Sequence, residues 1–250
     1  MERQELLAAL RAAPPRERII TALDTGDQES ALALAARLGP DAPMVKVGLE
    51  LFSAAGPAVV AALQARGQRV FLDLKYNDIP NTVASAARIA ARLGVAMVTM
   101  HAGCGRAAMT AAAEALATAE TPDGRPRPAL LAVTVLTSLG QDDLDETGPG
   151  PDSVLDRVQR LARLAWQNGC DGLVCSAADL PSLRAALGPE PLAVTPGIRP
   201  AGAETQDQKR VATPAGAMRD GADFLVVGRP ITRAQDPARA HAEIVAQLEV

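Results

Sequence analysis

From Pro15 onward, the chain alternates between short apolar runs rich in β-branched residues and longer Ala/Leu-rich segments. The short runs are apolar on both faces, which is typical of parallel strands covered by helices. Eight strand–helix units in a chain of 250 residues predict a single-domain α/β fold, the (β/α)8 TIM barrel. A doubly wound open sheet is the alternative architecture. The expected strands are 18–24, 43–48, 69–75, 95–102, 129–137, 171–177, 191–197 and 222–229.

The segments between these runs have the features of amphipathic helices. Apolar residues between 154 and 165 recur at helical spacing, so they share one helix face. A capping side chain followed by proline marks two helix starts, at Thr213-Pro214 and Asp236-Pro237. No shift in composition and no low-complexity linker divides residues 17–250, so we expect one domain. The glycines expected at helix ends are Gly39, Gly67, Gly94, Gly169, Gly188 and Gly221.

Composition argues against several classes of partner. The net charge is −4, charges of both signs are interspersed, and aromatic residues make up only 2% of the chain. Nucleic-acid binding favours a basic surface with aromatic stacking platforms, so we expect no nucleic-acid partner. The chain has only two histidines, far apart in sequence, and no Cys-x-x-Cys pair, so we expect no metal site.

The N-terminal segment and the cysteines bear on location. Residues 1–16 carry charges where a signal peptide would have an unbroken apolar run, and no apolar stretch is long enough to cross a membrane. Three cysteines cannot all be paired, which favours a reducing compartment. We therefore expect a cytoplasmic protein without a membrane partner. We expect residues 1–16 to form a short N-terminal extension, an optional helix outside the barrel.

Polar residues gather where the expected strands end. In a barrel the carboxyl ends of the strands meet at one face, and barrel enzymes place their active sites there. Solvation alone explains poorly why this end of eight separate strands is polar. The residues at these strand ends are Asp24, Lys46, Asp73, Lys75, His101, Thr137, Ser176, Arg199 and Arg229. We assign no role to His101.

The stretch VFLDLKYNDIPNT, residues 70–82, holds the densest group of charges. Asp73 and Lys75 are two positions apart on a strand, so their side chains share a face. Inside a barrel neither charge is stable alone, so we expect mutual neutralisation, which Lys46 on the neighbouring strand could join. A purely structural ion pair at the rim is the alternative. Asp78 is poorly explained as a helix cap, because Pro80 at the first helical position makes Ile79 the cap.

Two glycine–arginine loops follow the last two strands, in TPGIRP and VVGRP. Glycine lets backbone amides approach an anion, and arginine offers a fork of donors to phosphate oxygens. Barrels commonly bind phosphate after strands seven and eight, so a phosphorylated small molecule is the expected ligand. Two long connections, 138–153 and 198–212, lie on the same face, and long structureless loops are usually functional.

Taken in order, these motifs resemble the orotidine 5′-phosphate decarboxylase family. The resemblance runs from about Ile19 to the C-terminus, and its most specific part is the D-x-K-x-x-D-I-x-N-T block. Asn77 and the turn HAGCG depart from the usual pattern of the family. The motifs are ALD, KVG, FLDLKYNDIPNT, AVTVLTS, VCSA, VTPGIRP, DQKR and VVGRP.

The resemblance implies decarboxylation of orotidine 5′-monophosphate to UMP in pyrimidine synthesis, without cofactor or metal. It implies that Lys75 donates a proton to C6 of the pyrimidine and that Asp73 faces the departing carboxylate. Lys46 and Asp78 would complete a Lys-Asp-Lys-Asp array, in a homodimer whose Asp78 and Thr82 reach the neighbouring site. The substrate-binding residues it implies are Asp24, Lys46, Asp73, Ile79, Thr82, Thr137, Arg199, Gln208, Gly228 and Arg229.

Two other functions remain open at the level of sequence. A metal-dependent sugar-phosphate decarboxylase or aldolase resembles the chain around D-x-K-x-x-D, but that group has an acidic ligand where this chain has Lys46. A phosphate-binding barrel without catalysis, acting as a sensor or scaffold, is the alternative from another class. The complete set of alternating charges argues against it.

Overall fold

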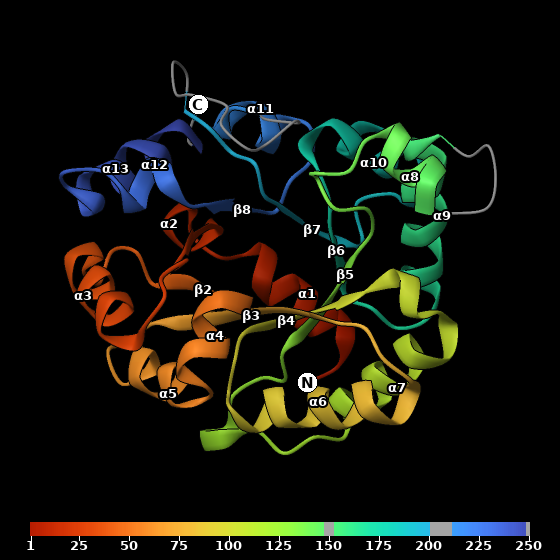
Figure 1. The fold of residues 1–250 in the computed structure, drawn as a ribbon, viewed down its shortest axis with the longest axis horizontal. Coiled ribbons are helices and arrows are strands. Elements are labelled where there is room, and N and C mark those ends of the chain that lie inside the picture. The colour runs from red at the N-terminus through yellow and green to blue at the C-terminus, as the bar shows by residue number, and fades with distance from the viewer. Residues whose placement is uncertain (148–152, 201–211, 249–250) are drawn as a thin grey trace.

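The computed structural model describes residues 1–147, 153–200 and 212–248. Within them, eight parallel strands close into a barrel in chain order, and β8 returns to pair with β1. Helices surround the strands as an outer ring (Figure 1), so the predicted TIM barrel is confirmed. The strands are β1 (Ile19–Ala22), β2 (Met44–Gly48), β3 (Arg69–Tyr76), β4 (Met97–His101), β5 (Ala129–Val133), β6 (Gly172–Val174), β7 (Leu192–Thr195) and β8 (Phe224–Val227).

Helices occupy the segments between the strands, as the spacing of apolar residues predicts. One correction concerns the connection 138–153, which contains a helix, α8, rather than only irregular chain. The α-helices of the described chain are α1 (Arg3–Arg11), α2 (Pro15–Arg18), α3 (Gln28–Leu38), α4 (Leu49–Ala55), α5 (Ala58–Gln64), α6 (Pro80–Arg92), α7 (Arg106–Ala117), α8 (Gln141–Thr147), α9 (Val154–Gln167), α10 (Leu180–Leu187), α11 (Pro214–Arg219), α12 (Arg229–Thr232) and α13 (Pro237–Val245).

Local signals place the helix ends. The Thr213 side chain accepts a hydrogen bond from the backbone N–H of Gly216 at 3.1 Å, and Asp236 accepts one from Arg239 at 3.0 Å. Both predicted caps are therefore confirmed. The six predicted glycines all have positive φ, between 67° and 106°. This is the left-handed region that suits glycine at a helix end, because no Cβ clashes with the backbone there.

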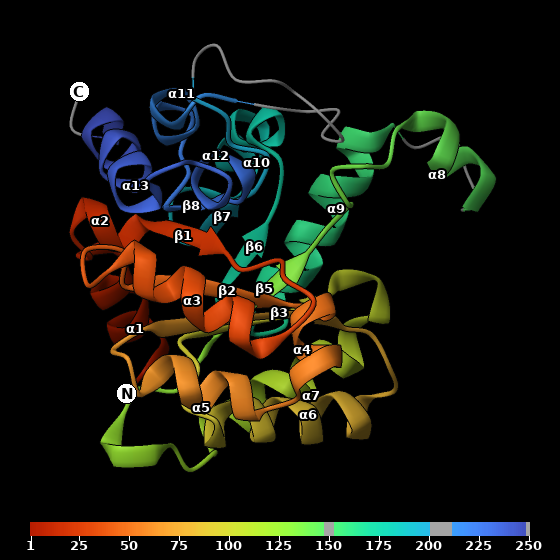
Figure 2. The same ribbon diagram turned by 60° about the vertical axis from the view of Figure 1, so that its left-hand side comes forward.

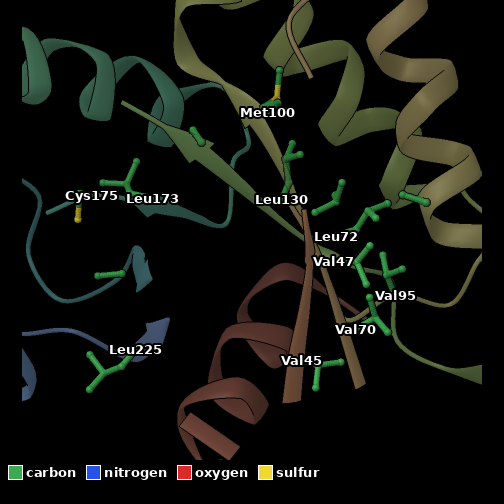
Figure 3. Close-up of a cluster of buried hydrophobic side chains, with 14 of the residues drawn as sticks. Val45, Val47, Val70, Leu72, Val95, Met100, Leu130, Leu173, Cys175 and Leu225 are labelled. Carbon is green, nitrogen blue, oxygen red and sulfur yellow. The ribbon is translucent and has the colours of Figure 1, made fainter. Parts of the chain in front are cut away.

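Apolar side chains fill two concentric layers. The outer layer lies between the strands and the helices, and Figure 3 shows Val45, Val70, Leu130 and Leu225 in it. The inner layer fills the barrel itself, because alternate residues of each strand point inward. Toward the amino-terminal end of the barrel the inward-facing residues are apolar. The polar residues at the strand ends lie toward the carboxyl-terminal end. The inner apolar layer includes Ile20, Met44, Phe71, Met97, Leu131, Val194 and Phe224.

The N-terminal helix α1 is part of this inner core. Leu6, Leu7 and Leu10 are 3–5% exposed and pack in one cluster with inner-layer residues of the strands. Figure 2 shows α1 beside the starts of the strands, on the side away from α8. The expected short helix is present as Arg3–Arg11, and beyond that expectation it packs across the amino-terminal end of the barrel. Sequence spacing identifies a helix but does not show what it packs against.

Charged residues anchor α1 to the barrel. The Asp171 carboxylate, fully buried before β6, accepts two hydrogen bonds from Arg127, at 2.7 and 3.0 Å. The Arg3 guanidinium lies 3.5 Å from the same carboxylate and 3.8 Å from the ring centroid of Trp166. A buried carboxylate is stable only with such partners. Through Arg3, α1 therefore helps to neutralise the Asp171 carboxylate.

We predict that α1 is required for full stability. Leu7→Ala should lower the free energy of unfolding by about 2–5 kcal/mol, because it opens a cavity in the inner core. The matched control is Leu155→Ala, at a side chain that is 40% exposed, for which we expect a change within about 0.5 kcal/mol. Urea denaturation measures both. Equal stability of Leu7→Ala and the wild type would mean that α1 packs on the barrel only loosely.

Candidate active site

A carboxylate between two ammonium groups occupies the carboxyl-terminal mouth of the barrel. Asp73 on β3 accepts hydrogen bonds from the Lys75 ammonium, with Nζ 3.0 Å from both carboxylate oxygens. Lys46 Nζ on β2 lies 3.9 Å from Asp73 Oδ2 and donates to Asp24 Oδ1 at 2.8 Å. The side chains of Asp73 and Lys46 are only 13% and 12% exposed. The expected cluster of mutually neutralising charges is present.

Lys75 reaches this cluster through an irregular backbone. Its φ is 51°, a left-handed conformation that costs a non-glycine residue about 1–2 kcal/mol. The pairing of β3 with β4 shifts at this place: Leu72 pairs with Val98, but Tyr76 pairs with Met100. Simple strand alternation therefore predicts the shared face of Asp73 and Lys75 but not the bulge that carries Lys75. Backbone strain of this kind is typical of functional sites.

Two residues that shape the cluster are missed by sequence reasoning. A Cβ at Gly48 would lie 2.7 Å from Lys46 Nζ, so the glycine leaves room for the ammonium. Thr99 on β4 is fully buried, and its hydroxyl donates to Asp73 Oδ1 at 3.0 Å. Both stand in apolar runs that read as ordinary strand. Gly48 lies on the same strand as Lys46, so its role depends on where the Lys46 side chain is placed. Thr99 reaches Asp73 only through the pairing of β3 with β4.

A cationic cavity adjoins the charge cluster. Its volume is about 510 Å³, and its lining includes Asp24, Lys46, Arg199, Gly228 and Arg229. Arg199 is only 8% exposed, and its Nε has no hydrogen-bond partner among the described residues. Burial and the nearby positive charge of Arg229 lower the pKa of the Arg199 guanidinium. Two guanidiniums in a half-enclosed cavity form a site for a polyvalent anion such as phosphate.

A second, smaller cavity of about 170 Å³ lies over the cluster itself. Lys46, Asp73, Lys75 and Thr137 line it together with apolar residues of the barrel. Lys46 also lines the larger cavity, so the two adjoin. Thr137 follows β5 by four residues rather than ending it. The arrangement suits a ligand with a phosphate at one end and a polar ring at the other.

The remaining predicted residues lie elsewhere. Asp78, Ile79 and Thr82 are exposed at the start of α6, and Asp78 makes no ion pair within the described part of the chain. Ile79 is the N-cap of α6, with Pro80 at the first position, as the sequence predicts. Asp78 Oδ1 accepts a hydrogen bond from the Ile79 N–H at 2.6 Å. Gln208 lies outside the described residues.

Two general features complete the description of the site. Across residues 1–147, 153–200 and 212–248, no three His, Cys, Asp or Glu side chains are grouped so as to hold a metal ion. None of the helices in the described chain is long and apolar enough to span a membrane.

His101, at the end of β4, is half-buried, and burial together with the charges of Lys75 and Arg157 lowers its pKa. These effects favour the neutral form of the imidazole.

Comparison with known proteins identifies the family. The model of the "Orotidine 5′-phosphate decarboxylase / HUMPS family" matches residues 17–244, nearly the whole barrel. The chain belongs to this family. The finding agrees with the resemblance drawn from the sequence motifs.

Relatives within the family cover the chain almost completely. The orotidine 5′-phosphate decarboxylase of Moorella thermoacetica is 49% identical over 94% of this chain and 93% of its own length. That of Halorhodospira halophila is 52% identical over 94% of this chain and 96% of its own length. The crystal structure of the enzyme from Lactobacillus acidophilus is 39% identical, covers 94% of this chain and 100% of its own, and has a TM-score of 0.85.

Proposed function

We propose that this protein removes CO2 from orotidine 5′-monophosphate to give UMP, in pyrimidine synthesis, without a cofactor. The observation that carries the proposal is the Lys46–Asp73–Lys75 ion-pair cluster beside an arginine-lined cavity, in a chain of this family. The relatives named as orotidine 5′-phosphate decarboxylases support the same substrate. A cytoplasmic location is part of the proposal, favoured by three cysteines that form no disulfide with one another.

Lys75 is the proposed proton donor. Loss of CO2 leaves an electron pair on C6 of the pyrimidine, so the transition state carries developing negative charge at that carbon. An ammonium held there in advance stabilises this charge without reorganising during the reaction. The same ammonium then transfers its proton to C6, as a general acid. Asp73 holds Lys75 at 3.0 Å and, in the proposed complex, faces the carboxylate that departs.

In this proposal, the two cavities bind different parts of the substrate. Arg199, Gly228 and Arg229 bind the phosphate, with Gln208 closing over it from the segment beyond Arg199. Asp24 and Lys46 bind the ribose hydroxyls, and Thr137 contacts the pyrimidine. The support for this division is the shared lining of the two cavities and the Nε of buried Arg199, which has no hydrogen-bond partner among the residues the structure describes. Binding energy from a phosphate far from C6 serves to order the site around the reacting carbon.

Lys46 favours this reaction over the metal-dependent alternative. A sugar-phosphate decarboxylase or aldolase that uses Mg²⁺ needs carboxylate ligands free to bind the ion. Here the ammonium of Lys46 lies 2.8 Å from Asp24 and 3.9 Å from Asp73, where it would repel a divalent cation. A barrel that binds phosphate without catalysis has no need of the strained Lys75.

We also propose a homodimer that completes the site. Asp78 and Thr82 of one subunit would reach the cluster of the other, with Ile79 at the same contact, completing a Lys-Asp-Lys-Asp array. The support is the exposure of this segment: Ile79 is 67% exposed and Ile89 on α6 is 51% exposed. An exposed apolar surface bordered by polar residues is a feature of subunit contacts. The Asp78 carboxylate accepts a hydrogen bond from the Ile79 backbone N–H at 2.6 Å, immediately before the start of α6.

The test of the proposed activity is to add orotidine 5′-monophosphate to the purified protein and follow the pyrimidine absorbance, with and without EDTA. We expect turnover that is unchanged by the chelator. Lys75→Ala should lower kcat by about 10⁴-fold or more, because charge stabilisation and proton donation are both lost. Its affinity for UMP should stay within about tenfold, since the arginine cavity is intact.

Two outcomes would contradict this activity, and a third would contradict the role of Lys75. Absence of any decarboxylation would reject the substrate, and loss of turnover in EDTA would favour the metal-dependent alternative. Wild-type kcat in Lys75→Ala would remove this residue from the mechanism.

The shared site predicts complementation between inactive subunits. Lys75→Ala and Asp78→Ala homodimers should each lose most activity. After subunit exchange, a heterodimer has one site with both mutations and one site with neither. Activity should therefore return to about half of the wild-type value per heterodimer, a statistical expectation for an isologous dimer. Native mass spectrometry measures the exchange. No recovery despite complete exchange would place Asp78 outside the neighbouring site.

A further inference from the structure

One buried hydroxyl on β4 contacts both partners of the central ion pair. Thr99 Oγ1 accepts a hydrogen bond from the backbone N–H of Lys75 at 2.8 Å and donates to Asp73 Oδ1 at 3.0 Å. We propose that Thr99 is a positioning residue, a clamp that holds the left-handed turn at Lys75 and the carboxylate of Asp73 in register. The proposal rests on the proposed function for its kinetic consequence.

The backbone around Lys75 explains why a side chain is needed. Between the pairs Leu72–Val98 and Tyr76–Met100, β3 advances four residues while β4 advances two. A strand with extra residues bulges away from its neighbour, and a backbone N–H in the bulge loses the carbonyl that a regular ladder would supply. The Lys75 N–H is in this position and donates its hydrogen bond to the Thr99 hydroxyl instead. The hydroxyl therefore stabilises the φ of 51° at Lys75.

The direction of the two hydrogen bonds is determined by chemistry. A backbone N–H can only donate and an ionised carboxylate can only accept, whereas a hydroxyl does both. The single hydroxyl hydrogen of Thr99 must therefore point at Asp73. Asp73 Oδ1 then accepts from both Thr99 Oγ1 and Lys75 Nζ, each at 3.0 Å. Thr99 thus connects the backbone of Lys75 to the carboxylate that orients its own ammonium.

Other buried threonines lack this role and provide a control. The hydroxyls of Thr21, Thr134 and Thr195 are buried and have no hydrogen-bond partner among the described residues. Thr21 lies on β1 between inward-facing Ile20 and Ala22, so its side chain faces the helices. Thr21 and Thr99 are both fully buried strand residues, so the same substitution removes the same group at both.

The experiment compares Thr99→Val, Thr99→Ser and the control Thr21→Val. Valine keeps the shape but removes donor and acceptor, whereas serine keeps both. In Thr99→Val we expect kcat for orotidine 5′-monophosphate to fall about 10²-fold, the usual effect of a displaced catalytic group, with KM changed less than threefold. Thr99→Ser should restore kcat to within about threefold, and Thr21→Val should keep the wild-type kcat. A merely structural role for Thr99 would not produce this split and rescue.

A second readout does not depend on activity. Hydrogen exchange at the Lys75 amide, followed by NMR, should be at least about tenfold faster in Thr99→Val than in the wild type and should be slow again in Thr99→Ser. Wild-type kcat and wild-type exchange in Thr99→Val would overturn the clamp. A serine variant as slow in turnover as the valine variant would overturn it too. If the wild type fails to decarboxylate the substrate, the proposed function fails, and the exchange data alone decide on the clamp.

If Thr99→Val does not fold, Thr99→Ala and Thr99→Ser provide the same comparison. Thermal unfolding then separates stability from positioning. Thr99→Ala with a wild-type melting temperature and a low kcat supports the clamp. Thr99→Ala with wild-type kcat overturns it.

Discussion

The contact on which the site depends is the carboxylate of Asp73 between the ammonium groups of Lys75 and Lys46. Both nitrogens lie within 4 Å of the carboxylate oxygens. At this distance a pair of unit charges interacts by about 4 kcal/mol for an effective dielectric constant near 20. Much of that gain offsets the hydration that these mostly buried charges lose, so the cluster contributes little to stability. In the proposed mechanism, its role is to fix the Lys75 ammonium in advance where negative charge develops at C6.

The barrel separates the parts that stabilise it from the parts that act. The amino-terminal end is covered by α1, whose leucines extend the inner core and whose Arg3 reaches the buried Asp171. The carboxyl-terminal end carries the charges, the strained Lys75 and the arginine cavity. Barrel enzymes in general place chemistry at the carboxyl-terminal face and stability at the other. Apolar burial in the two layers of the core offsets the cost of holding partly desolvated charges at the mouth.

The sequence predicts the repetitive parts of this molecule well, because alternation, capping side chains and glycines act locally. All eight strands, the cap at Ile79 and the shared face of Asp73 and Lys75 follow from such patterns. Sequence reasoning misses what depends on distant segments meeting. That Gly48 leaves room for the Lys46 ammonium can be seen only once the lysine side chain is placed. The Thr99 clamp can be seen only once the shifted pairing of β3 with β4 is known. The packing of α1 across the barrel is missed for the same reason.

The most direct test of the central claim is the crystal structure of the protein with UMP bound. The account predicts that the Lys75 ammonium points at C6 of the pyrimidine at about 3–3.5 Å, the range of a poised reacting pair, and keeps its contact with Asp73. The phosphate should lie against Arg199 and Arg229. A complex in which the Lys75 ammonium turns away from the base, or in which Asp73 leaves it to bind another group, would contradict the account.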